Sequence, residues 1–220
     1  MKGYPLVAPS VLSLDFSRLD SELERMKEAG VSLLHYDVMD GHFTPWISFG
    51  EHLFKFFTHR GFQTDVHLMV NDPLTHVQNF INLGADQVTV HLEALDDPFA
   101  FLRGIKDYRN GRIIGLALNP DTPLDERVWA ILPQFDKVMV MSVVPGRSGQ
   151  SFIEGSDERI HQIKEYIREN NLNILVEVDG GINDRTGPVC VRAGADILVS
   201  GAYLCMADDP RRALEDILGE

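Results

Sequence analysis

The sequence contains little cysteine and no long apolar run. Its two cysteines in 220 residues, Cys190 and Cys205, form no Cys-x-x-Cys pair, which argues against a cysteine-ligated metal and a disulfide framework. We expect both thiols to be reduced and buried. The N-terminal stretch lacks the apolar core and cleavage site of a signal peptide, and no apolar run is long enough to span a bilayer. We therefore expect a cytoplasmic protein without a membrane partner.

Positive charge is also scarce. There are 20 Lys and Arg residues against 33 Asp and Glu residues, and the formal net charge is −13. Such a balance disfavours binding to nucleic acid and to anionic membranes, because both depend on an excess of cationic side chains. It does not exclude a small anionic substrate, since a pocket can be locally positive in an acidic protein.

Eight short apolar runs alternate with amphipathic stretches of helical periodicity. Near-continuous apolar character indicates strands that are buried on both faces, as in a parallel sheet. A doubly wound open sheet would carry a Gly-x-Gly-x-x-Gly turn after an early strand, and the sequence has none. The expected strands are Leu6–Leu12, Val31–Val38, Thr64–Val70, Asp86–Leu92, Arg112–Leu118, Asp136–Val143, Asn173–Val178 and Asp196–Gly201.

Three of the predicted helices end in a similar junction, in which a glycine is followed directly by the next strand. The junctions read EAGVSLL, NLGADQV and RAGADIL. Glycine suits a helix end that needs a positive φ, and a repeated helix–glycine–strand junction is typical of a βα repeat. We predict an α/β protein, a (β/α)8 TIM barrel that forms a single domain over residues 1–220.

Polar side chains occur near the ends of these apolar strands, where the active sites of such barrels lie. His35 and Asp37 are two residues apart and share one face of their strand, His67 lies in the third strand, and Asp179 follows the seventh. Two histidines and two aspartates that point inward would suit a divalent cation. Taken singly, each residue is better explained as a hydrogen-bonded core histidine or a helix-capping aspartate; the four together favour a site.

Two carboxylates lie one layer deeper, Asp65 before His67 and Glu177 before Asp179. They could accept the second ring N–H of the ligating histidines. They are equally compatible with strand starts in a solvated layer.

Glycine-rich segments follow the last three strands: PGRSGQSF, VDGGI and VSGAYL. Backbone N–H groups of loops at this place in a barrel commonly bind phosphate. Tight turns alone would also explain glycines, but three adjacent loops favour a phosphate site. The candidate substrate-binding positions in these loops are Gly146, Ser148, Gly149, Gly180, Gly181, Gly201 and Ala202.

Taken together, these segments resemble the ribulose-phosphate 3-epimerase family, whose barrels are of the ribulose-phosphate-binding type. The matching segments are APSVLSLDF, HYDVMDGHFTP, DVHLMV, VHLEA, LNPDTP, MSVVPGRSGQSF and EVDGGI. The resemblance implies one catalytic divalent metal, zinc first and iron, manganese or cobalt as alternatives. It matches His35, Asp37, His67 and Asp179 to the four ligands, and Asp37 and Asp179 to the acid/base pair. It matches Ser10, His67, Met39, Met69 and Met141 to residues at the substrate.

The implied reaction is epimerisation at C3 of a phosphorylated ketose, D-ribulose 5-phosphate to D-xylulose 5-phosphate first. One carboxylate removes the proton next to the carbonyl, the metal stabilises the enediolate, and the other carboxylate returns a proton on the opposite face. A Schiff-base aldolase would need a lysine at a strand end, and none of the six lysines is so placed. A non-catalytic sugar-phosphate-binding barrel stays an alternative, although it predicts damaged ligands. The family also suggests a homo-oligomer.

Three positions depart from the family pattern. Trp46 stands where the family usually has asparagine, and the segment Val144–Gln150 reads VPGRSGQ in place of NPGFGGQ. Ala202 replaces a serine hydroxyl. The metal ligands are unchanged, so the reaction type stands, while the substrate remains open. A longer ketose phosphate such as D-allulose 6-phosphate is the alternative, with Trp46 and Arg147 reshaping the pocket.

Overall fold

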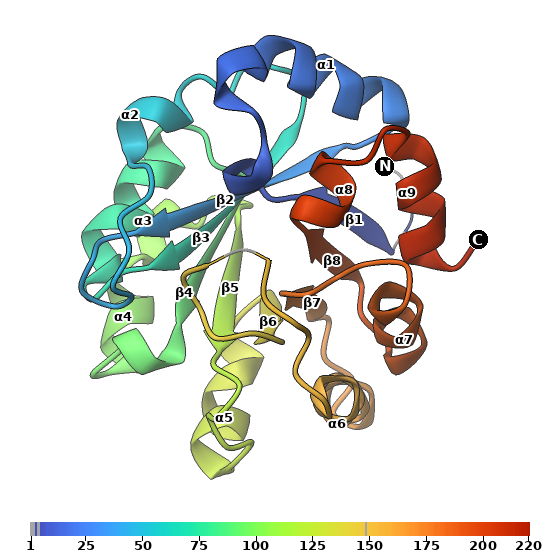
Figure 1. Ribbon diagram of the computed structural model, residues 1–220. Helices are drawn as coiled ribbons and strands as arrows, with labels where there is room; N and C mark the ends of the chain where they lie inside the picture. The colour runs from blue at the N-terminus through green and yellow to red at the C-terminus, as the bar shows by residue number, and fades with distance from the viewer. Residues whose placement is uncertain (1–2, 4, 148) are drawn as a thin grey trace.

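The computed structural model describes residue 3, residues 5–147 and residues 149–220. Eight parallel strands lie side by side in the order β1-β8-β7-β6-β5-β4-β3-β2, and helices surround them (Figure 1). The predicted (β/α)8 barrel is confirmed. The strands are β1 Leu6–Pro9, β2 Leu33–Met39, β3 Gln63–Met69, β4 Gln87–His91, β5 Ile113–Leu118, β6 Lys137–Met141, β7 Leu175–Asp179 and β8 Ile197–Ser200.

Each predicted strand is present, with shorter ends in several cases. The first was expected to reach Leu12, but β1 ends at Pro9 because Val11–Ser13 form a 3-10 turn. The helices are α1 Leu19–Ala29, α2 Glu51–Phe54, α3 Pro73–Asn82, α4 Pro98–Gly104, α5 Glu126–Ile131, α6 Ser156–Glu169, α7 Thr186–Ala193, α8 Ala202–Cys205 and α9 Pro210–Leu218. No helix among the described residues is both long and apolar enough to cross a membrane.

The three glycine junctions have the backbone that the sequence predicts. Gly30, Gly84 and Gly194 have φ values of 100°, 99° and 107°. In this region a side chain would be strained, so glycine ends each helix and lets the next strand start immediately.

Alternate residues of each strand face two different cores. Along β2, Leu34, Tyr36 and Val38 pack outward into the large cluster between strands and helices. Inside the barrel, small apolar clusters, one of them Ala8, Leu33 and Ile197, fill part of the interior. Each buried side chain of this kind stabilises the fold by about 1.5–3 kcal/mol. The remaining inward positions carry polar groups, which the alternation places together.

β1 and β2 close the barrel where the ladder of hydrogen-bonded strands ends. They are joined by an isolated parallel bridge between Ser10 and His35. Both residues were predicted to contribute to a site, so the seam of the barrel passes through it.

Candidate active site

Strand register brings the predicted site residues to one end of the barrel. In the β2–β3 ladder, His35 lies opposite Asp65, and Asp37 lies opposite His67. Asp179, the last residue of β7, lies opposite Met141 of β6. The inward faces of β2, β3 and β7 therefore carry these groups toward the same end of the barrel.

The four predicted ligands converge. One ligand atom from each of His35, Asp37, His67 and Asp179 lies within 4.8 Å of all the others. Asp37 Oδ1 is 3.3 Å from His35 Nε2 and 3.1 Å from His67 Nδ1. Asp179 Oδ2 is 3.8 Å and 3.5 Å from the same two nitrogens. The two histidines thus face the carboxylates through different ring atoms.

The donor set fits a divalent cation. His35 is fully buried, and its Nε2 makes no hydrogen bond to any described residue. A buried polar atom left without a partner costs about 1–3 kcal/mol, so this nitrogen is suited to a ligand. Two imidazole nitrogens and two carboxylate oxygens are a set that Zn²⁺ accepts, as do Mn²⁺, Fe²⁺ and Co²⁺.

The charges of this cluster also favour a cation. Burial lowers the pKa of His35, but the neighbouring Asp37 outweighs it and raises the pKa well above its usual value. Burial also lowers the pKa of His67, but hydrogen bonds to Asp179 and Asp37 outweigh it, and the pKa is raised. Burial would raise the pKa of Asp37, yet His35 and His67 lower it. The carboxylates therefore favour positive charge between them, which is the condition that a divalent cation requires.

The layer beneath the ligands differs in part from the prediction. Asp65 Oδ2 accepts the bond from His35 Nδ1 at 2.9 Å, as the sequence suggested. Glu177 does not hold a histidine, because its Oε1 is 3.8 Å from His35 Nδ1 while its Oε2 is 2.5 Å from Lys137 Nζ. Burial and the charge of Asp65 raise the pKa of Glu177 to about 8. Both carboxylates are fully buried, so neither is a solvated strand start.

His67 is supported by a second histidine rather than by a carboxylate. Its Nε2 is 2.8 Å from Nε2 of His91, and the two rings stack with centroids 4.9 Å apart. His91 Nδ1 in turn lies 3.2 Å from Glu93 Oε2. Burial lowers the pKa of His91 to about 4, so this ring is neutral near pH 7. His91 was assigned no role from the sequence.

A cavity of about 450 Å³ opens above the ligands. Asp37 and Asp179 reach the wall of this cavity, whereas His35 and His67 are fully buried beneath it. His67 was predicted to contact the substrate, but it does not line the cavity. Ser10 Oγ donates a hydrogen bond of 2.7 Å to Asp37 Oδ2. The predicted residues that do line the cavity are Ser10, Met39, Met69, Met141, Gly146, Gly149, Gly180, Gly181, Gly201 and Ala202.

The glycine loops form the other side of this cavity. Ser148 lies outside the described residues. Gly180 has a φ of 121°, and a Cβ there would lie 2.3 Å from Val143; at Gly181 it would lie 2.5 Å from the backbone nitrogen of Phe152. Close packing thus requires these two glycines. Among the described residues, Arg147 is the one cationic side chain on the cavity wall.

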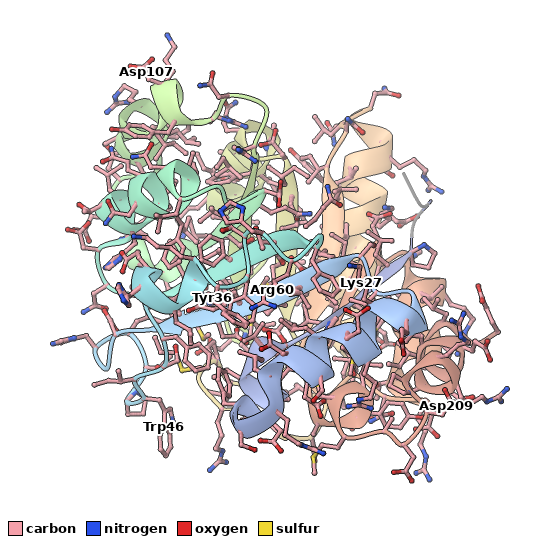
Figure 2. All side chains as sticks on the ribbon, turned by 90° about the horizontal axis from the view of Figure 1, so that it is seen from above. Lys27, Tyr36, Trp46, Arg60, Asp107 and Asp209 are labelled. Atoms are coloured by element: carbon pink, nitrogen blue, oxygen red, sulfur yellow. The ribbon has the colours of Figure 1, made fainter. Side chains whose placement is uncertain are left out.

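The loops that depart from the family pattern meet at the edge of the cavity. Trp46 projects from the body of the molecule, with 51% of its surface exposed (Figure 2). A Cβ at Gly146 would lie 3.1 Å from the ring of Trp46, so the loop after β2 touches the loop after β6. A change at Trp46 therefore reaches the loop that carries Arg147.

Comparison with known proteins gives one consistent family. Residues 6–205 match the model of the "Ribulose-phosphate 3 epimerase family". A protein of Mycobacterium tuberculosis named ribulose-phosphate 3-epimerase is 39% identical over 96% of this chain and 91% of its own length. One of Bacillus subtilis with the same name is 36% identical over 97% and 98%. The crystal structure of orotidine 5'-phosphate decarboxylase from Pyrococcus horikoshii superposes with a TM-score of 0.68 at 17% identity, covering 97% of each chain, which bears on the fold alone.

Proposed function

The chain belongs to the ribulose-phosphate 3-epimerase family, and on that basis we propose that it interconverts the C3 epimers of D-ribulose 5-phosphate and D-xylulose 5-phosphate. The observation that carries this proposal is the cavity itself. At one end, two carboxylates meet two buried histidines; at the other, glycine loops and one arginine surround the space. A substrate with an acidic C–H next to a carbonyl at one end and a phosphate at the other matches both.

Asp37 and Asp179 are the proposed acid/base pair. Both reach the cavity wall and come from strands on different sides of the barrel mouth. One carboxylate takes the C3 proton and the other delivers a proton to the opposite face, and the roles reverse with the direction of reaction. The hydrogen bond from Ser10 fixes Asp37 Oδ2, which leaves Oδ1 toward the histidines.

His35, Asp37, His67 and Asp179 are the proposed ligands of one divalent cation, with zinc as the first candidate. When bound, the cation supplies positive charge that stabilises the enediolate as it develops. Met39, Met69 and Met141 line the wall beside this charge with uncharged thioethers.

The phosphate is proposed to bind at the glycine loops, through backbone N–H groups near Gly146, Gly149, Gly181 and Gly201 and through Arg147. Arg147 matters because the two carboxylates described on the cavity wall, Asp37 and Asp179, carry charge of the same sign as the phosphate. D-allulose 6-phosphate is the second candidate substrate. The departures at Trp46 and Arg147 favour it, because Arg147 lies on the cavity wall and Trp46 packs against Gly146 of the same loop.

The experiment is a side-by-side assay of D-ribulose 5-phosphate, D-allulose 6-phosphate and related ketose phosphates. The protein is first freed of metal with a chelator and then given Zn²⁺, Mn²⁺, Fe²⁺ or Co²⁺. In D₂O, we expect deuterium at C3 of the preferred substrate and of its epimer. The absence of turnover with every sugar phosphate and every ion would contradict the proposal.

A further inference from the structure

A lysine is buried in the interior of the barrel, beneath the proposed metal site. Lys137 is the first residue of β6 and is 0% exposed; among the described residues it is the one fully buried lysine. Met139 and Met141 follow it on the same face of the strand, and Met141 lines the cavity. Lys137 therefore lies two layers below the cavity, too deep to contact a substrate.

The ammonium group of Lys137 is surrounded by acceptors from three other strands. Its Nζ donates hydrogen bonds to Asp65 Oδ1 at 2.6 Å and to Gln87 Oε1 at 3.0 Å. It also forms an ion pair of 2.5 Å with Glu177 Oε2. The position of this cation is thus defined by β3, β4 and β7, and it in turn holds two buried carboxylates together.

One of these carboxylates continues to the metal site. Asp65 uses Oδ1 for Lys137 and Oδ2 for His35 Nδ1, at 2.9 Å. A carboxylate bonded to Nδ1 fixes the imidazole with its proton there, so that the lone pair lies on Nε2. His35 Nε2 is buried, has no hydrogen-bond partner in the part of the chain that the structure describes, and faces Asp37 and Asp179.

We propose that Lys137 is a positioning residue of the metal site: it anchors Asp65, which orients His35 so that Nε2 is directed at the cation. The inference rests on the proposed metal ligands but not on the substrate. Without the ammonium group, Asp65 and Glu177 would be two buried carboxylates without a shared partner. Glu177 Oε1, 3.8 Å from His35 Nδ1, would then compete with Asp65 for the ring.

The group formed by His35, Asp65 and Glu177 could itself hold a cation on geometric grounds. Lys137 Nζ already occupies the space between the two carboxylates, at 2.6 Å and 2.5 Å from them. We therefore expect one divalent ion per chain, in the upper group.

The test is the affinity of the protein for Co²⁺ and Zn²⁺, measured on the metal-free chain by calorimetry and by Co²⁺ absorption. Lys137→Met should weaken binding by about ten-fold or more, the range for groups that orient a ligand, and should alter the Co²⁺ spectrum. Lys164→Met is the control, because it also breaks a lysine–aspartate pair of 2.6 Å, with Asp196, but from the outer helix α6. That variant should bind metal like the wild type.

A double-mutant cycle with Asp65→Asn shows whether Lys137 acts through Asp65. The double variant removes both charges of the Lys137–Asp65 pair and leaves neither one unpaired, so it should fold even if Lys137→Met alone does not. Its metal affinity should equal that of Asp65→Asn, because the connection to His35 is already broken. A further loss in the double variant, or an unchanged affinity in Lys137→Met, would each overturn the proposal. If the wild-type chain binds neither ion, the proposed metal site itself fails.

Discussion

The cavity has two unlike regions, a floor and a rim. The floor is made of His35, Asp37, His67 and Asp179, all on strands; the rim is made of Trp46, Val144 and Arg147, all in loops. The two floor histidines are fully buried, whereas Trp46 and Val144 are 51% and 62% exposed. The floor holds the residues that the resemblance assigns as ligands, and the rim holds the positions at which the sequence was expected to depart from the family. The contrast suggests that the floor determines which reaction occurs and the rim determines on which sugar phosphate.

The largest effect is expected from the floor. Asp179→Asn should lower kcat by about 10²–10⁴-fold, because the acid/base group is lost, and should abolish exchange of the C3 proton with solvent deuterium. Asp37→Asn should do the same. Metal content must be measured in both variants, and thermal unfolding should show an intact fold. Asp184→Asn, an exposed carboxylate outside the cavity wall, is the control. Normal turnover by Asp179→Asn would rule out the two-carboxylate mechanism.

A smaller effect of a different kind is expected from the rim. Arg147→Met should raise KM for the sugar phosphate by about ten-fold and leave kcat nearly unchanged, since a charge-assisted contact to phosphate contributes to binding rather than to proton transfer. Inorganic phosphate should also inhibit the variant more weakly. Arg185→Met changes an exposed arginine that does not line the cavity and should have no effect. A fall in kcat with constant KM would place Arg147 in the chemistry instead.

Trp46→Asn tests whether the rim selects the substrate. We expect the ratio of kcat/KM for D-ribulose 5-phosphate and D-allulose 6-phosphate to change by about three- to ten-fold, at the low end of what a pocket gives for one carbon, because the ring is half exposed. Metal affinity should stay the same. If both kcat/KM values fall equally, Trp46 supports the loop after β6 but does not discriminate between the two substrates.

The smallest effect is expected on the free energy of unfolding, from Glu93, which contacts His91 behind the floor. Burial opposes the low pKa of Glu93, but its hydrogen bonds with His91 and Thr122 lower that pKa to about 2, from 4.5. Its contribution to the free energy of unfolding is therefore present above pH 4.5 and is lost as the pH falls toward 2. Glu93→Gln should flatten the decline of stability between those pH values, as measured by urea unfolding of the metal-free protein. An identical decline in both proteins would contradict this role.

The sequence was sufficient for the fold and for the floor because both depend on periodicity. The apolar runs gave eight strands, and the two-residue alternation placed His35 and Asp37 on one face. Lys137 is on the same face as Met139 and Met141, so the alternation also puts it inside the barrel; a single lysine in an apolar strand was the available signal. The partners of Lys137 could not be predicted, because they come from β3, β4 and β7, and the sequence alone does not give the register between these strands.

The same limit applies to His67. The sequence suggested a carboxylate of the deeper layer, Asp65 or Glu177, for each ligating histidine, while the observed partner of His67 is His91 on β4, next to His67's own strand. The two alternatives are similar in chemistry, and the choice depends on how far each strand is shifted along the barrel. Ring orientation and side-chain reach then decide which of two suitable groups is in contact.

The seam between β1 and β2 has a consequence for how the chain is made. β1 completes its ladder with β8, about 190 residues later, and touches β2 through the bridge of Ser10 with His35. On the ribosome, β2 and β3 can pair soon after synthesis, but β1 must wait until β8 has emerged. The contact of Ser10 with Asp37 spans 27 residues of sequence, whereas the β1–β8 ladder that holds β1 in place spans about 190, so the floor is complete only when the two ends of the chain have met.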